Sequence, residues 1–323
     1  MTALILLVGI VAVPAILAGY IALVEIVLRV LPEKRQPTLR PWLWMAPALL
    51  FLTVFLLYPT LNTLYLSLLD AQSTVFVGFR NYVRAVTNYE VQIAFRNNLL
   101  WLTVFSTISL GLGLVLAIVT DRLRYQSAVK SIMFIPMAIS FVAAGVIWKF
   151  VYEFRPLGEA QIGSLNAVLG VVVRDFRPVA WLVAPFANNL ALIAVGVWIW
   201  TGFCLVILSA ALRAIPAELM DAARVDGAGE WQVASRIVVP ALGPTISVVA
   251  TTLAIFALKA FDIVYVMTSG NFGTEVIANR MYREMFTFQD FGRASALAVI
   301  LLAATVPVAV ANVRQFRRQE ALR

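Results

Sequence analysis

The sequence of 323 residues contains no histidine, one cysteine and few charged residues, which make up 13% of the chain. A soluble globular protein carries roughly 25% charged residues, so a single water-soluble domain is not expected. Cys204 lies in an apolar run, so metal sites built on histidine and cysteine, and histidine-based catalysis, are excluded. No Gly-Lys pair occurs, which excludes the phosphate-binding loop that ends in Gly-Lys-Ser/Thr. We therefore expect neither an enzyme nor a cofactor-binding chain.

Apolar residues, by contrast, make up 62% of the chain and fall into long stretches. Seven runs contain no charged residue: 1–24, 41–69, 97–120, 131–148, 178–212, 237–258 and 294–313. A helix that crosses a bilayer needs roughly 17–25 apolar residues, and each run is long enough. The first run lacks the basic start of a signal peptide and is longer than its apolar part, which favours a membrane helix. The sequence predicts an all-α, polytopic membrane helical bundle with about seven transmembrane helices.

The segments between the runs alternate in their content of basic residues. Segments 25–40, 121–130, 213–236 and 314–323 hold 14 Lys or Arg in 60 residues, and segments 70–96, 149–177 and 259–293 hold 11 in 91. Because cytoplasmic loops are enriched in Lys and Arg, this predicts an outer N-terminus and a cytoplasmic C-terminus. The formal net charge of +8 is spread over short loops, so membrane lipid is the expected surrounding and nucleic acid is not an expected partner.

The inner segment 213–240 has the most informative pattern. Pro216 suits the start of a short surface helix, with acidic residues in its first turns and Arg224 near its end, as the helix dipole favours. Asp226 and Gly227 then supply a turn, since glycine adopts positive φ freely. A second helix is predicted from about Glu230 to Val239. Small residues around the turn leave a smooth surface that the groove of another protein can approach closely.

This segment resembles the signature loop of permease subunits of ATP-binding-cassette (ABC) importers, in which Glu-Ala-Ala, three residues and Gly precede a spaced Ile-x-Leu-Pro. The matching residues here are Asp221-Ala222-Ala223, Asp226-Gly227-Ala228 and Ile237-Val238-Val239-Pro240. Two departures from the pattern matter: Asp221 stands where Glu is usual, and Ala234 stands where Phe is frequent. The resemblance implies an ATPase-coupling loop with these contact residues: Glu218, Asp221, Ala222, Ala223, Asp226, Gly227 and Ala228.

Three further segments are similar to motifs of the sugar-importer permeases. They are Phe76–Tyr82 (Phe-x-Gly-x-x-Asn-Tyr), Phe261–Gly270 (Phe-Asp-x-x-Tyr-x-x-Thr-x-Gly-Gly) and Asp290–Ala296 (Asp-Phe-Gly-x-Ala-Ser-Ala). The resemblance covers residues 42–315, which implies a six-helix importer core, and it leaves residues 1–31 as an additional N-terminal transmembrane helix. Within this family the chain resembles permeases for α-glucosides such as maltose, sucrose, trehalose or glucosylglycerol.

The resemblance also implies a function. The chain would be a permease subunit that carries a sugar, an α-glucoside or another oligosaccharide, across the cytoplasmic (inner) membrane. Its implied partners are a second homologous permease, two copies of a cytoplasmic ATP-binding subunit and an extracytoplasmic sugar-binding protein. ATP and Mg would be bound by the ATPase subunits, and this chain would bind no cofactor.

The family places its substrate site on the two helices that flank the coupling loop. The corresponding substrate-path residues here are Trp200, Phe203, Thr252, Phe256, Lys259 and Phe261. Aromatic faces stack on sugar rings, and hydroxyl and charged groups satisfy sugar hydroxyls. Packing of the bundle is the alternative role for the aromatic residues. Lys259 and Asp262 are three residues apart, so the alternative is that they form an ion pair with each other and have a structural role.

An ion-coupled secondary transporter or channel is the competing hypothesis. Its ion-coupling groups would be the charged residues next to the apolar runs, Glu25, Lys149, Lys259 and Asp262. All four lie at the ends of their runs and not in the middle of a span, where long basic side chains reach the interface. This position favours the importer hypothesis.

Overall fold

The computed structural model describes residues 2–121 and 123–320, and within these ranges it contains helices and no β-strand. The chain divides into two compact units, Met1–Thr63 and Leu64–Arg323. Arg122 and Arg323, two of the basic residues counted for the predicted inner side, lie outside the described residues. The prediction of an all-α polytopic membrane protein is confirmed.

The first unit is built mainly from two long helices, α1 (Thr2–Val30) and α2 (Gln36–Leu52). A π-helical segment, η1 (Thr53–Leu57), continues α2 into α3 (Tyr58–Leu66). The hydroxyl of Tyr20 donates to the carbonyl of Leu43, and the Arg40 guanidinium lies 3.6 Å from the Glu25 carboxylate. These two contacts hold α1 against α2.

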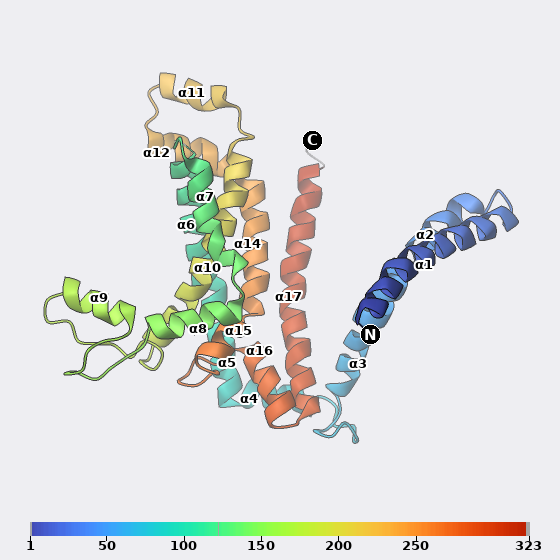
Figure 1. Ribbon diagram of the computed structural model, residues 1–323, viewed down its shortest axis with the longest axis horizontal. Helices are drawn as coiled ribbons and strands as arrows, with labels where there is room; N and C mark the ends of the chain where they lie inside the picture. The colour runs from blue at the N-terminus through green and yellow to red at the C-terminus, as the bar shows by residue number, and fades with distance from the viewer. Residues whose placement is uncertain (1, 122, 321–323) are drawn as a thin grey trace. The chain divides into compact units, whose positions relative to one another are not determined.

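The second unit contains the remaining helices (Figure 1). Their bounds in chain order are α4 (Arg80–Thr87), α5 (Tyr89–Leu100), η2 (Trp101–Phe105), α6 (Ser106–Thr120), α7 (Gln126–Phe134), η3 (Ile135–Ala138), α8 (Phe141–Val151), α9 (Ser164–Val172), α10 (Ala187–Leu212), α11 (Ala217–Val225), α12 (Glu230–Val233), η4 (Ala234–Val238), α13 (Val239–Ala241), α14 (Gly243–Leu258), α15 (Asp262–Met267), α16 (Ile277–Tyr282), η5 (Arg283–Thr287) and α17 (Phe291–Glu320).

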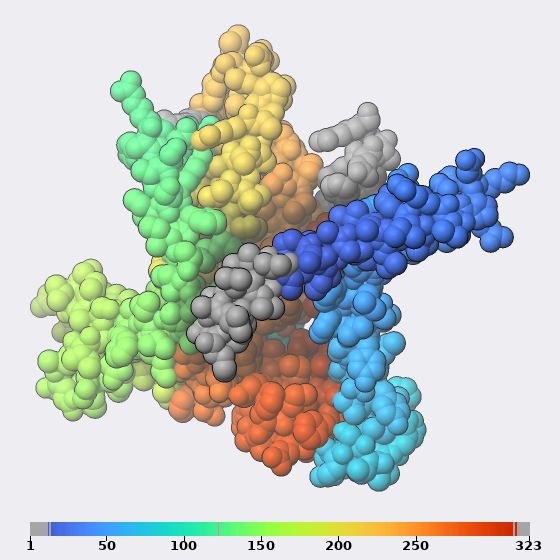
Figure 2. Space-filling model, turned by 45° about the vertical axis from the view of Figure 1, so that its right-hand side comes forward, coloured from blue at the N-terminus to red at the C-terminus, as the bar shows by residue number. Residues whose placement is uncertain are grey.

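The second unit has two distinct ends (Figure 1). Helices α11 and α12 lie at one end, which we call the α11 end, together with the last turns of α17. Helices α4, α8, α15 and α16 lie at the opposite, α4 end. Figure 2 shows the surface of the same two ends, with residues of α11 (yellow) at the top and residues around α16 (orange) at the bottom. Within the second unit, the basic-rich segment 213–236 therefore lies at the α11 end, and segments 70–96 and 259–293, which hold fewer basic residues for their length, lie at the α4 end.

Within the described residues, four helices have the length and composition of membrane spans, and two bent helix pairs raise the number to six if each pair is one span. Four are single stretches: Gln36–Leu66, Tyr89–Thr120, Ala187–Leu212 and Phe291–Asn312. The other two are bent pairs, Gln126–Ala138 with Phe141–Val151 at 98° and Glu230–Ala241 with Gly243–Leu258 at 71°. The seventh predicted span falls in α1, which is a helix of 29 residues, and the count of seven stays a prediction.

The two bends differ from the uninterrupted helices expected over 131–148 and 237–258, and local chemistry explains both. Pro136 lies in the 3-10 segment η3, Ile139 is extended, and the Ser140 side chain accepts from the Ala143 N–H to begin α8. Proline lacks an N–H and disfavours a continuing helix, and serine is a strong N-cap. At the second bend Pro244 lies in the first turn of α14, where its missing N–H leaves no bond unmade.

Helix α10 forms the centre of the second unit and is buried along most of its length. A methyl group on Gly113 of α6 would overlap the Cβ of Cys204, so these two helices approach as closely as backbone atoms allow. Trp101 and Phe105, both fully buried, pack on the same helix. This core fixes α10 as the rigid element that precedes the α11 loop.

Candidate functional site

The predicted coupling loop is a short helix with a defined turn. Helix α11 begins after Pro216 and ends at Val225. The N–H of Ala228 donates to the Ala223 carbonyl (2.9 Å), and the N–H of Gly227 donates to the Arg224 carbonyl (3.0 Å). This pair of bonds is a Schellman motif, which requires a left-handed residue at Gly227, where φ is +85°. The predicted helix and turn are therefore present.

One face of this loop packs on the chain itself. The buried side chains of Leu212, Val233, Val238 and Leu242 form a small apolar cluster at the α11 end. Met220, Ala223 and Ala228 pack against this cluster. The small size of these two alanines lets α11 lie close to the end of α10, and their side chains face inward and not outward.

The opposite face of the loop is exposed. Five of the predicted contact residues lie in this exposed part: Glu218, Asp221, Ala222, Asp226 and Gly227. Three large apolar side chains are exposed here as well, Leu219 (51%), Val225 (87%) and Trp231 (81%). Sequence reasoning missed these three residues, because the sequence alone does not show which apolar residues of a loop are exposed.

Arg224 ties the two helices of the loop together. Its guanidinium lies 2.8 Å from the Asp221 carboxylate and 3.1 Å from the Glu230 carboxylate. The hydrogen bonds with Glu230 and Asp221 raise the pKa of Arg224. All three side chains are well exposed, so the pairs contribute little to stability, but they hold Asp221 in one orientation on the surface.

The predicted substrate-path residues lie partly in one aromatic cluster in the core. The ring of Trp200 is 4.8 Å from that of Phe256 and 5.4 Å from that of Phe203 (centroid distances). Phe105 and Phe141 each lie 5.2 Å from Phe256. The rings fill the space between them, and the cavity next to Phe256 holds only about 10 Å³. The indole N–H of Trp200 is buried and has no hydrogen-bond partner within the described part of the chain.

The other predicted path residues are more dispersed. The Thr252 hydroxyl donates to the Val248 carbonyl of its own helix (3.0 Å). Lys259 is exposed at the end of α14, and no ion pair joins it to Asp262 among the described residues. Phe261 borders the small cavity beside Phe256. The structure therefore brings Trp200, Phe203 and Phe256 together, with Phe261 at one side and Lys259 at the surface.

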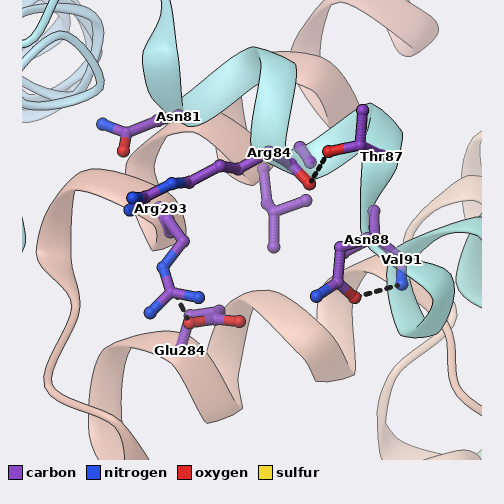
Figure 3. A pocket seen from close by; sticks show the side chains of 9 residues that line it. Asn81, Arg84, Thr87, Asn88, Val91, Glu284 and Arg293 are labelled. Carbon is purple, nitrogen blue, oxygen red and sulfur yellow. Dashed lines mark hydrogen bonds and ion pairs between the residues drawn. The ribbon is translucent and has the colours of Figure 1, made fainter.

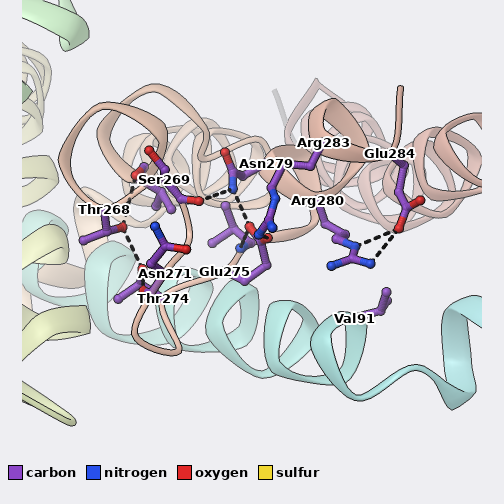
Figure 4. Close-up of polar contacts among 12 residues, drawn as sticks. Val91, Thr268, Ser269, Asn271, Thr274, Glu275, Asn279, Arg280, Arg283 and Glu284 are labelled. Atoms are coloured by element: carbon purple, nitrogen blue, oxygen red, sulfur yellow. Dashed lines mark hydrogen bonds and ion pairs between the residues drawn. The ribbon is translucent and has the colours of Figure 1, made fainter. Parts of the chain in front are cut away.

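The α4 end contains a buried charged network that sequence reasoning did not predict (Figure 4). The side chain of Glu284 is 2% exposed and lies 2.7 Å from the Arg280 guanidinium. The Glu275 side chain is 1% exposed, and its carboxylate lies 3.0 Å from the Arg283 guanidinium. Burial raises the pKa of the Glu275 carboxyl, against the opposing effects of the Asn279 amide and the Arg283 charge. Charged residues between apolar runs suggest exposed loops, so no local signal reveals this network.

Asparagine side chains connect this network to the neighbouring helices. The Asn97 amide on α5 donates to the carbonyls of Gly273 and Glu275, both at 2.8 Å. The next residue, Asn98, accepts from the Ile277 N–H at 2.8 Å. These bonds satisfy backbone groups of the loop between α15 and α16, so the loop is held in one conformation.

A cavity of about 210 Å³ borders this network (Figure 3). Its lining residues include Asn81, Arg84, Asn88, Glu284 and Arg293. Figure 3 shows Arg293 directed at the Glu284 carboxylate, where the closest atoms are 3.6 Å apart. Polar side chains from α4, η5 and α17 thus meet in one place at the α4 end.

No group of three or more histidine, cysteine, aspartate or glutamate side chains with metal-binding geometry occurs within residues 2–121 and 123–320. The buried carboxylates of Glu284 and Glu275 are instead paired with the guanidinium groups of Arg280 and Arg283.

Comparison with known proteins identifies the class to which this architecture belongs. Residues 109–320 match the family described as "Binding-protein-dependent transport system inner membrane component". The chain belongs to this family, and it is therefore a multi-pass permease subunit of an ABC importer in the inner membrane, and not an enzyme.

Two curated relatives are similar over most of the chain. The osmoprotective compounds uptake permease protein GgtC of Synechocystis is 55% identical over 281 residues, which cover 87% of this chain and 100% of that protein. The α-glucoside transport system permease protein AglF of Rhizobium meliloti is 46% identical over 283 residues, covering 87% of this chain and 84% of that protein.

A solved structure shares the fold. It is the crystal structure of a bacterial ABC transporter involved in alginate import, with a TM-score of 0.75 and 24% sequence identity. The match covers 88% of this chain and 99% of that chain. This chain therefore shares the fold of that chain.

Proposed function

We propose that this chain carries a sugar of the α-glucoside type, or another oligosaccharide, across the inner membrane, with ATP hydrolysis in partner subunits as the source of energy. The main support for this proposal is the exposed face of α11. It presents Leu219, Val225 and Asp221 on a rigid helix that ends in a Schellman turn. A rigid helix seated in the groove of an ATPase subunit transmits a movement of that subunit, whereas a loop without internal bonds would absorb it.

We infer the partners from the family and from the number of coupling loops. This chain offers one such loop, whereas an ATPase pair that closes on ATP needs two, so a second homologous permease is required. Two ATP-binding subunits, which would hold ATP and Mg, and an extracytoplasmic sugar-binding protein complete the proposed assembly. This chain itself would bind no cofactor.

The proposed substrate class rests on the relatives and on the aromatic cluster. The two relatives above are named for osmoprotective compounds and for α-glucosides. The buried indole N–H of Trp200 has no partner among the described residues, and Phe256 lies against the same ring. A buried donor without a partner is costly, and a sugar hydroxyl supplies an acceptor when the helices separate to admit substrate.

We further propose the orientation and the division of the chain. The N-terminus would lie outside and the C-terminus in the cytoplasm, so the α11 end would be the inner end and the α4 end the outer end. Residues 1–31 would form an additional N-terminal transmembrane helix, and residues 42–315 the importer core. Within the second unit, the basic-rich segment 213–236 lies at the α11 end and segments 70–96 and 259–293 lie at the α4 end (Figure 1), and this separation supports the proposed orientation.

The proposal is tested by uptake into proteoliposomes that contain this chain, its second permease and the ATPase subunits. Binding protein and radiolabelled maltose, sucrose, trehalose or glucosylglycerol are added outside, with ATP sealed inside. We expect uptake of at least one of the four sugars, dependent on ATP and on the binding protein. Uptake that persists without ATP and requires an ion gradient would instead support the ion-coupled alternative, and no uptake of any of the four would contradict the substrate class.

The structure gives the ion-coupled alternative little support. Of its candidate groups, Glu25 pairs with Arg40 at a surface where both side chains are well exposed. The Lys149 ammonium donates to the Val266 carbonyl at 3.3 Å. Neither group lies unpaired in the middle of a span, which is where ion-coupling residues are found.

A further inference from the structure

A groove at the α4 end has a lining that the proposed substrate path does not include. Its volume is about 370 Å³, and it lies between α15, α16 and η5. Small-molecule sites commonly occupy roughly 300–1,000 Å³. The residues that matter for the argument are three aromatic and three polar ones: Tyr265, Tyr282, Phe286, Asn271, Asn279 and Arg283.

The aromatic residues of the groove form a continuous row. Phe261 stacks on Tyr265 with ring centroids 5.2 Å apart and planes at 19°. Tyr282 follows at 5.1 Å from Tyr265, and Phe286 at 4.8 Å from Tyr282. Phe286 is 64% exposed and Tyr265 is 40% exposed, so ring surface remains open to a ligand. Open aromatic faces beside polar groups suit the apolar face of a sugar ring.

The polar residues of the groove include a buried acceptor that has no partner. Asn279 is fully buried, and its amide nitrogen donates to the Ser269 carbonyl (3.3 Å) and to the Glu275 carboxylate (2.5 Å). Its side-chain oxygen has no hydrogen-bond partner in the described part of the chain. Figure 4 shows Asn279 held between Ser269 and Glu275. A buried acceptor of this kind is costly to leave unpaired, and a hydroxyl donor from a ligand satisfies it.

Glu275 holds two polar side chains of the groove, Asn279 and Arg283, in place. Its second carboxylate oxygen binds the Arg283 guanidinium at 3.0 Å. A Cβ atom at Gly270 would overlap the Glu275 carboxylate, and φ there is +77°, so only glycine leaves room for this arrangement. The same carboxylate thus orients both Asn279 and Arg283, and further N–H groups of Arg283 are available as donors to hydroxyl oxygens.

The row of aromatic residues also reaches the predicted substrate path. Phe261, its first member, borders the small cavity that Phe256 lines. Phe256 in turn lies against Trp200. Phe261 therefore lies between the exposed groove and the buried aromatic cluster, and it borders the small cavity that Phe256 also lines.

We propose that this groove is a carbohydrate subsite, in which a pyranose ring of the transported sugar stacks on Phe286 and Tyr265 and donates a hydroxyl to the Asn279 side-chain oxygen. The inference rests on the proposed function, since it takes the substrate to be a sugar. It adds a second binding position, outside the Trp200–Phe256 cluster, that a sugar occupies before it enters the bundle.

The test is the concentration dependence of uptake in the proteoliposome assay with the four labelled sugars. Phe286→Ala removes a mostly exposed ring and is expected to fold. We expect its KM for uptake to rise about five- to tenfold with little change in the maximal rate, since ring stacking contributes modestly to binding. Phe286→Trp keeps a ring and should restore a KM near that of the unaltered chain. Phe79→Ala, another strongly exposed aromatic residue of the α4 end, is the matched control and should leave KM unchanged.

Two outcomes would overturn the subsite while leaving the proposed function standing. One is an unchanged KM in Phe286→Ala when the unaltered chain transports sugar. The other is a fall in maximal rate together with loss of binding-protein association in the absence of sugar, which would make the groove a protein contact. Failure of the unaltered chain to transport any of the four sugars would instead contradict the proposed function, and the subsite with it.

Discussion

The two ends of the second unit use the same kind of ion pair in opposite environments. At the α4 end, Arg280 and Glu284 are four residues apart, and their side chains are 9% and 2% exposed. At the α11 end, Asp221 and Arg224 are three residues apart, and their side chains are 68% and 38% exposed. Breaking a buried pair leaves an uncompensated charge, whereas an exposed pair is screened by water. The ion pairs of the α4 end are therefore part of a fixed scaffold, and those of the α11 end lie on the surface to which we propose that the ATPase subunits bind.

Breaking the buried pair gives the largest expected effect. Glu284→Ala leaves the Arg280 guanidinium buried without its carboxylate, which costs about 3–5 kcal/mol. Asp221→Ala, the matched change at the exposed end, costs about 0–1 kcal/mol. The measurement is the fraction of monodisperse protein that remains after heating in detergent, compared across a temperature series. Equal losses for the two variants would contradict the contrast between the two ends.

The turn after α11 provides the second prediction. Gly227→Pro cannot adopt the φ of +85° and removes the N–H that binds the Arg224 carbonyl. Strain of about 1–3 kcal/mol in this turn should lower ATP-dependent uptake roughly tenfold or more, without loss of membrane insertion. Gly229→Ala is the control, because φ is −68° there and a Cβ atom meets only the far end of Gln232. Normal uptake by Gly227→Pro would show that the turn has no coupling role.

The exposed face of the loop provides the third prediction. Trp231→Ala removes a large apolar side chain that is 81% exposed, and Asp221→Lys reverses a charge on the same surface. Each should weaken association with the ATPase subunit by about 1–2 kcal/mol, which is roughly five- to thirtyfold in affinity. Co-purification at decreasing ATPase concentration measures the change. Tyr125→Ala, also strongly exposed but in a different loop, is the control. Unaltered co-purification of both variants would place the contact elsewhere.

The smallest of the four expected effects is a change in the pH dependence of stability. Because burial raises the pKa of Glu275 in the folded chain above its ordinary value of 4.5, the folded state binds this proton more tightly than the unfolded state. Stability should therefore fall as the pH rises from 4.5 towards the raised pKa. Glu275→Gln carries no titrating group and should lose that part of the slope. Melting curves between pH 4.5 and 7 that have the same slope in both proteins would contradict this assignment.

Local patterns in the sequence predicted the helix and the turn of the proposed coupling loop. A proline, an Asp-Gly pair and a run of small residues are enough to predict α11 and its turn, because a Schellman motif depends on neighbours in the chain. The inward orientation of Ala223 and Ala228 could not be predicted, since it depends on Leu212 and Val233 in other elements. The exposed Trp231 was missed for the same reason, as only the fold distinguishes an exposed apolar residue from a buried one.

The spans were predictable in position but not in shape. Uncharged runs mark where the chain can enter the bilayer. Among the described residues, four of the seven runs correspond to single candidate spans, and two more correspond to the bent helix pairs. The bend of 98° after Pro136 depends on how the next helix is capped, and proline within a membrane helix is often tolerated without a break. The ion pairs of Glu284 could not be predicted from the sequence. In the sequence its partners Arg280 and Arg293 resemble charged residues of exposed loops, and only the fold brings them to Glu284.

The Phe-x-Gly-x-x-Asn-Tyr motif, Phe76–Tyr82 in this chain, has a structural role. The Asn81 amide donates to the carbonyls of Ser67 (2.9 Å) and Leu69 (2.7 Å), and the Tyr82 hydroxyl lies 2.6 Å from that of Ser67. These residues close the loop that leads into α4. Their role at the α4 end is therefore structural, and it does not depend on contact with a substrate.

The central claim is that this chain works as one permease of an importer whose ATPase subunits bind the α11 end. The most direct test is to purify the tagged chain from its native membrane in detergent and to identify the proteins that accompany it. We expect an ATP-binding subunit and a second, homologous permease, with less of the ATP-binding subunit accompanying Asp221→Lys or Trp231→Ala. A homo-oligomer without those proteins, from a membrane shown to contain them, would contradict the claim.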